Sequence, residues 1–206
     1  MPASVTDNTI ADRSIRQACG SIIYGVQPKA YTDFTKVPEI PSDKMSEKRF
    51  WGIGQGNLRA TVLQVANALS TVVRDGLYKA PRLIYDETDP FNERTDRKIP
   101  ASSNSFAVVR DGMHAVIYED GGTAYSSFRN KDILNRDMKI GGKTGSTTNP
   151  NHAWFECFAE DQTGRAVVIA ILVERGESGG GEAAPLGVRL LDLVNRAGYV
   201  GKPPQE

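Results

Sequence analysis

The fold is decided by a stretch of three segments, which starts with Gly141-Gly142-Lys143-Thr144-Gly145-Ser146 and continues with Asn151-His152-Ala153-Trp154-Phe155. The third segment is the most apolar run of the chain, Ala166-Val167-Val168-Ile169-Ala170-Ile171-Leu172-Val173. Short apolar runs separated by turn residues, such as those of Asp161–Gly164, are typical of β-strands. We therefore predict an antiparallel meander whose first strand, at the edge of the sheet, carries Lys143.

This predicted edge strand has the features of a peptide-binding surface. Side chains alternate along a strand, so Lys143 and Thr144 point to opposite faces unless the glycines twist the backbone. Gly145 has no Cβ and lets another chain approach closely. A peptide lying here would gain main-chain hydrogen bonds, and Lys143 with Thr144 could hold its carboxylate. The alternative is that Lys143 only protects the strand edge and Gly145-Ser146 opens a turn, because a single Lys-Thr-Gly triplet is common.

The other two strands carry different hydrophobic patterns. Residues 153–159 alternate, with Trp154, Glu156 and Phe158 on one face and Phe155 and Cys157 on the other. Residues 166–173 are apolar on both faces, which predicts a central strand with helices on either side. The predicted fold class is α+β, with an antiparallel β-sheet flanked by helices.

Three helices are predicted from periodicity and capping signals. Thr61 and Gln64 form a capping box at the start of a helix that Gly76 ends. Apolar residues at helical spacing predict a second helix at 101–118 and a third at 182–196, with Pro185 in the first turn of the third. The intervening segments are predicted as a short strand at 78–85, a charged loop at 86–97, a polar connection at 125–136 and a flexible glycine-rich loop at 176–181.

Composition excludes several classes of protein. The 206 residues hold 25 basic and 25 acidic side chains, a balance that does not suggest a nucleic-acid or acidic-membrane partner. We identify no apolar run long enough to span a membrane and no secretory signal. The two cysteines, Cys19 and Cys157, and the two histidines, His114 and His152, lack metal-ligand spacing, so we expect no metal or cofactor and a buried free thiol at Cys157.

These landmarks together resemble the carboxy-terminal part of a penicillin-binding protein transpeptidase domain of the class B, elongation type. Six stretches stand in the family's order and cover roughly residues 50–196: Gly54-Gln55-Gly56 with residues 60–68, Asp111-Gly112-Met113, Gly122-Thr123-Ala124, Gly142-Lys143-Thr144-Gly145, His152-Ala153-Trp154-Phe155 and Ala183-Ala184-Pro185. The domains expected from this resemblance are an irregular lead-in or tail at 1–50, the transpeptidase part at 51–198 and a tail at 199–206.

The resemblance implies a peptidoglycan D,D-transpeptidase that acts on D-Ala-D-Ala stem peptides and reacts with β-lactams. It implies catalytic roles for Lys143 and Ser146, the first through its positive charge and the second through a backbone N–H in the oxyanion hole. Lys143, Thr144, Gly145 and Ser146 together would bind the substrate. The strand with His152, Trp154 and Phe155 is structural in the family. The resemblance also implies an extracytoplasmic domain in a parent protein anchored by an amino-terminal helix.

The sequence departs from the family in its nucleophile. The family attacks with a serine in Ser-x-x-Lys, and no serine of this sequence has lysine three residues later. Ser102-Ser103-Asn104 matches the family's Ser-x-Asn motif in letters but follows the Gly-Gln-Gly helix instead of preceding it, so we interpret it as a helix cap. We expect a fragment that is inactive alone and that pairs with the missing upstream half of the domain or self-associates. The alternative is a non-catalytic penicillin-binding-like sensor or scaffold module.

Overall fold

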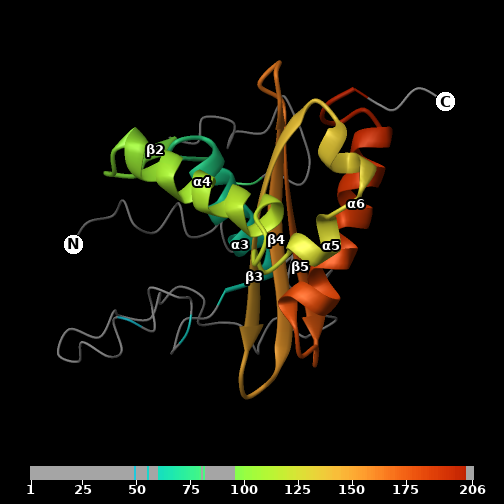
Figure 1. Ribbon diagram of the computed structural model, residues 1–206. Coiled ribbons are helices and arrows are strands. Elements are labelled where there is room, and N and C mark those ends of the chain that lie inside the picture. Colours follow the sequence, from blue (N-terminus) through green and yellow to red (C-terminus); the bar gives the residue numbers. More distant parts are fainter. Residues whose placement is uncertain (1–48, 50–54, 56–59, 80, 82–95, 203–206) are drawn as a thin grey trace, which may run out of the picture. The chain divides into compact units, whose positions relative to one another are not determined.

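The computed structural model describes residues 49, 55, 60–79, 81 and 96–202. The chain divides into two compact units, Met1–Ala60 with Ala80–Thr95 and Thr61–Lys79 with Asp96–Glu206. All helices and strands given below belong to the second unit (Figure 1). The predictions made for residues 1–48, for Cys19 and for the glycines at 54 and 56 lie outside the described residues.

The second unit is built on a three-stranded antiparallel sheet, which forms the long arrows of Figure 1. Strands β3 (Met138–Thr147), β4 (His152–Asp161) and β5 (Ala166–Glu174) are ordered β3-β4-β5, so the meander is confirmed and β3 is an edge of the described sheet. Among the described strands β4 is the middle one and β5 is an edge, so the described residues do not show the central position predicted for 166–173. Helices cover both faces of β5. An apolar run predicts that both faces of a strand are covered, but it does not predict how many strands lie beside it in the sheet.

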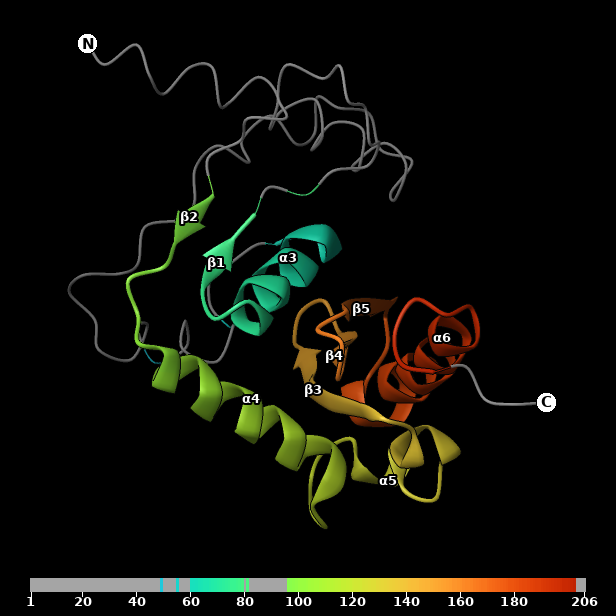
Figure 2. The same ribbon diagram turned by 90° about the horizontal axis from the view of Figure 1, so that it is seen from above.

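Helices lie on both faces of the sheet, as Figure 2 shows. Helix α3 (Val62–Val73) packs on β4 and β5, where Leu69 meets Phe158 and Met113. Helix α6 (Ala184–Arg196) packs on the opposite face, where Leu191 belongs to the main core. Helix α4 (Ser103–Tyr118) packs against β3. The α+β prediction is confirmed.

The helix ends follow the predicted caps. Thr61 is the N-cap of α3, and both hydrogen bonds of its capping box with Gln64 are present. Gly76 follows α3 with a φ of +85°, a left-handed conformation that glycine adopts without strain. Ser102 is the N-cap of α4 and accepts from the Ser105 amide, so Ser102-Ser103-Asn104 is the helix start that the sequence predicted.

The connections differ more from expectation. At the start of the strand predicted at 78–85, the structure has β1 (Leu77–Tyr78), which pairs with β2 (Arg97–Lys98). Residues 80 and 82–95, which hold most of that predicted strand and of the charged loop predicted at 86–97, lie outside the described residues. The connection at 125–136 is not simply polar: it contains α5 (Tyr125–Phe128) and a 3-10 turn η4 (Asp132–Asn135), which bury Phe128 and Ile133. Part of the predicted glycine loop is a π-helical turn, η5 (Gly179–Ala183). Within the described ranges, the helices are too short or too polar to cross a membrane.

Candidate functional site: the outer edge of strand β3

The orientation of the main chain along β3 follows from its contacts with α4. The side chains of His114 and Tyr118 on α4 lie close enough to the Ile140 backbone for its polar groups to shift the pKa of both, so these groups point away from β4. Pairing of β3 with β4 is one-to-one from Met138 to Thr147, without a bulge. Alternate residues of an antiparallel strand share one orientation. The main-chain groups of Thr144 and Ser146 therefore also point to the outer edge.

Lys143 lies at this edge and is exposed. Its ammonium group donates a hydrogen bond to the carbonyl of Thr144, on the outer side of the strand. This contact keeps the positive charge beside the main chain of residues 144–146. A carboxylate or a developing oxyanion next to this edge would meet a cation already in place.

Glu156 faces Lys143 from the neighbouring strand, at the directly opposed position of the register. Burial raises the pKa of Glu156 to about 7, and the positive charge of Lys143 acts in the opposite direction. The Glu156 carboxyl thus changes charge near neutral pH beside the proposed substrate edge. Sequence reasoning gave Glu156 no role, although it is the one charged residue among the otherwise apolar residues 153–159.

The opposite face of β3 carries two hydroxyl side chains, each with a partner. Thr144 Oγ1 lies 2.7 Å from Thr123 Oγ1, and Ser146 Oγ accepts from the Gly179 amide at 3.2 Å. Thr144 is 9% exposed, whereas Thr123 is open to solvent. Thr123 belongs to the Gly122-Thr123-Ala124 stretch that the sequence identified as a landmark without giving it a role.

The turn η5 supports the backbone of β3 at Gly145. A Cβ on Gly179 would stand 2.4 Å from the Gly145 carbonyl oxygen and 2.5 Å from that of Trp154. These distances are shorter than side-chain carbons tolerate, so only glycine fits between the two strands and the turn. The carbonyl of Gly180 also accepts from Ser127 Oγ at 2.9 Å, which fixes the turn to α5.

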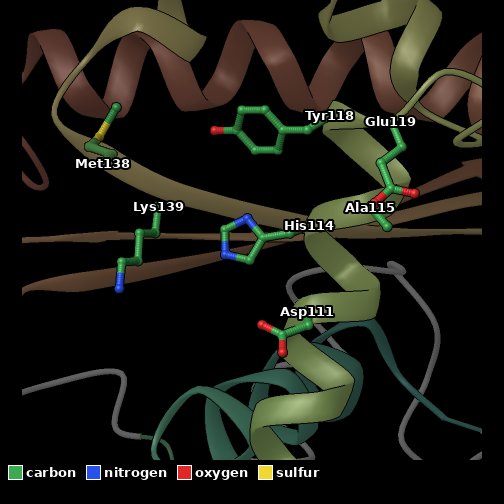
Figure 3. Close-up of a pocket in the computed structure, with 7 residues that line it drawn as sticks. All are labelled: Asp111, His114, Ala115, Tyr118, Glu119, Met138 and Lys139. Carbon is green, nitrogen blue, oxygen red and sulfur yellow. The ribbon is translucent and has the colours of Figure 1, made fainter.

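A hollow of about 460 Å³ opens at the other end of β3, between α4 and Met138–Lys139. Figure 3 shows His114 and Tyr118 reaching from α4 toward β3, with Asp111 lower on the same helix. Burial lowers the pKa of His114 and raises that of Tyr118, and the Ile140 backbone acts on both in the opposite direction. This hollow does not include Lys143, Thr144, Gly145 or Ser146, so it is distinct from the edge that sequence reasoning identified.

The remaining side chains singled out in the sequence have structural contacts. His152 accepts a hydrogen bond from the Arg175 amide through Nδ1, at the end of the ladder beyond Ser146. Cys157 is a free, fully buried thiol, and burial raises its pKa to about 12, as expected for a packing residue. Phe155 is fully buried in the main core.

Comparison with known proteins identifies a family for this architecture. The family model described as the penicillin binding protein transpeptidase domain matches residues 3–192, which is most of the chain. The match begins well before residue 50, where the quoted motifs start.

Individual relatives agree with this match. The chain is 26% identical over 192 residues to the peptidoglycan D,D-transpeptidase MrdA of Haemophilus influenzae. This alignment covers 74% of this chain and 28% of that protein. Among solved structures, it is similar to Pseudomonas aeruginosa PBP2 in complex with WCK 5153, with 28% identity, a TM-score of 0.56 and coverage of 76% and 34%. The PBP2 of a complex with MreC from Helicobacter pylori shares the fold, with 24% identity, a TM-score of 0.64 and coverage of 80% and 31%. The chain thus spans about a third or less of the length of each of these three proteins.

Proposed function

This chain belongs to the penicillin-binding protein transpeptidase family, and from that premise we propose that its β3 edge holds the substrate of a peptidoglycan D,D-transpeptidase. The substrate is the D-Ala-D-Ala end of a stem peptide, or a β-lactam that mimics it. One observation carries the proposal: the main chain of Thr144 and Ser146 points to the outer edge of β3, beside the ammonium group of Lys143. An extended peptide can add to such an edge as a further strand.

Each residue of the edge has a chemical role in this proposal. Lys143 supplies positive potential for the substrate and the nucleophile, and the Thr144 hydroxyl hydrogen-bonds the terminal carboxylate. Gly145 leaves room for the substrate backbone. The backbone N–H of Ser146 donates to the oxyanion that forms during acylation. Removing one oxyanion donor costs about 3 kcal/mol of transition-state stabilisation, which makes such donors central to the rate.

The acylated serine is proposed to come from sequence upstream of this segment, because no serine here stands in Ser-x-x-Lys. Its Oγ attacks the carbonyl carbon of the penultimate D-Ala, the C–N bond to the terminal D-Ala breaks, and the hydroxyl proton leaves on the released amine. An amine of a stem peptide on a neighbouring peptidoglycan strand then takes the acyl group, and the serine is restored. By this proposal the chain alone is catalytically inactive. The parent protein is proposed to be extracytoplasmic, facing the cell wall, and anchored in the membrane by an amino-terminal helix.

The test is labelling of the full-length parent by a fluorescent penicillin. We expect Lys143→Ala to slow acylation by about 100-fold, in the range seen when a preorganised electrostatic group is removed. Lys139→Ala is the matched control, because Lys139 lies four residues away on the same face of the same strand. Its labelling rate is expected to stay within about twofold of the wild type.

Equal labelling of the two lysine variants would overturn the substrate-edge proposal. If the wild-type parent is folded by circular dichroism and is still not labelled, a non-catalytic sensor or scaffold module is supported instead.

A further inference from the structure

Thr123 is placed beside the proposed substrate edge by a rigid backbone. A Cβ on the preceding Gly122 would lie 2.5 Å from the carbonyl oxygens of Ala115 and Val116, so this residue packs directly on the end of α4. The amide of Ala124 donates to the Val116 carbonyl at 3.1 Å. The carbonyl of Thr123 itself lies 2.3 Å from the position of a Cβ on Gly180. The main chain of Thr123 is therefore held on both sides, and its hydroxyl contacts Thr144 Oγ1.

The hydroxyls of Thr123 and Thr144 are 2.7 Å apart, close enough for one strong hydrogen bond. Each hydroxyl has one proton to donate and can accept through its lone pairs. If Thr144 donates to Thr123, Thr144 has no proton left for a ligand. If Thr123 donates, the Thr144 proton is available for a ligand. The hydrogen bond that the Thr144 hydroxyl then accepts makes this hydroxyl a stronger donor.

We propose that Thr123 is a positioning residue for carboxylate recognition: its hydroxyl donates to Thr144 Oγ1, so that the Thr144 hydroxyl donates to the terminal carboxylate of the substrate. A carboxylate accepts hydrogen bonds only, and its binding therefore selects this direction for the pair. The inference rests on the proposed function, because it assumes that Thr144 meets the substrate carboxylate. It assigns a specific task to a residue 21 positions earlier in the sequence.

The decisive experiment compares two probes on the full-length parent: a fluorescent penicillin with a free carboxylate and the same penicillin as its methyl ester. Valine matches threonine in shape and lacks the hydroxyl. We expect Thr123→Val to slow acylation by the free-carboxylate probe about tenfold and to leave the rate with the methyl ester unchanged within twofold. Thr123→Ser keeps the hydroxyl and is expected to restore the wild-type preference between the probes.

The pair is tested by combining substitutions. Thr144→Val should remove the preference for the carboxylate probe, and adding Thr123→Val to it should cause no further loss, since Thr123 acts through Thr144. Equal slowing of both probes by Thr123→Val, or additive losses in the double variant, would show a purely structural role and overturn the inference. So would a rate unchanged by Thr123→Val.

These outcomes are separable from failure of the proposed function. If Lys143→Ala and Thr144→Val both label like the wild type, the substrate edge itself is wrong. If they are slow and Thr123→Val is not, only the role of Thr123 is wrong. Thermal unfolding of each variant reports folding, and Thr123→Ala replaces Thr123→Val should valine prevent folding.

Discussion

The two ends of strand β3 have the same kind of charged pair with β4 but different contacts at their outer edge. Each end has a lysine on β3 opposite a glutamate on β4, Lys139 with Glu160 and Lys143 with Glu156. At the first end, helix α4 packs against β3, and its side chains His114 and Tyr118 lie beside the main chain of Ile140. At the second end, the Thr144 carbonyl is held by the ammonium group of the adjacent Lys143. A helix occupies one half of the edge, while the other half carries the cation and hydroxyls suited to a ligand.

The second end also depends on a support that the first end lacks among the described residues, the turn η5 beneath Gly145. We expect Gly179→Ala to destabilise the protein by about 3 kcal/mol, because the new Cβ would meet two backbone oxygens that cannot move independently. Penicillin labelling of the parent should fall as well, since the clash lies directly under Gly145. Urea unfolding and labelling rate measure the two effects.

Gly112→Ala is the matched control for this substitution. Gly112 lies in α4, near the first end of β3, and a Cβ there has no atom within 4 Å. Alanine is favoured over glycine in a helix interior by about 1 kcal/mol, so this variant should be more stable. A Gly179→Ala protein as stable as the wild type would show that η5 does not support the site.

Protonation of Glu156 makes the stability of the protein depend on pH, and this dependence tests the difference between the two ends of β3. The pKa of Glu156 is about 7 in the folded protein against 4.5 ordinarily, so the folded state binds the proton more tightly. The contribution of Glu156 to the free energy of unfolding is therefore greatest below pH 4.5, and it is lost as pH rises through 7. The shift corresponds to about 3 kcal/mol at most. Glu156→Gln should flatten the decline between pH 5 and pH 8 in urea unfolding.

Glu160→Gln is the control at the other end of the strand, opposite Lys139. An unchanged pH slope in Glu156→Gln would mean that the Glu156 carboxyl is hydrated in the folded protein. Equal slopes in the two variants would remove the distinction between the ends.

Local signals in the sequence were sufficient for the main elements of this fold. The capping box at Thr61, the turn at Asp161–Gly164 and the alternation along residues 153–159 each act within a few residues, and the structure contains all three. The lysine-containing stretch was correctly predicted on an edge strand because its glycines and polar residues differ from the apolar run that follows.

Features set by distant contacts could not be predicted in the same way. The π-helical turn at Gly179–Ala183 depends on close packing against Gly145, and a glycine-rich run has no periodicity that shows it. Phe128 and Ile133 are buried by helical turns of four residues, which are too short for a repeating pattern. The contact of Thr123 with Thr144 joins residues far apart in the chain, so it exists only after the sheet and α4 have packed.

The smallest expected effect tests whether the first end of β3 is closed for structural reasons alone. Tyr118→Phe removes the phenol oxygen that interacts with the Ile140 backbone. Because Ile140 is fully buried, we expect a loss of about 1 kcal/mol in unfolding free energy and faster hydrogen exchange at its amide. Penicillin labelling of the parent should not change, since the Lys143–Thr144, Thr123–Thr144 and Gly179–Ser146 hydrogen bonds do not involve Tyr118. A labelling rate reduced as strongly as in Lys143→Ala would mean that the two ends act as one site, and the division of β3 into a closed half and a ligand-binding half would fail.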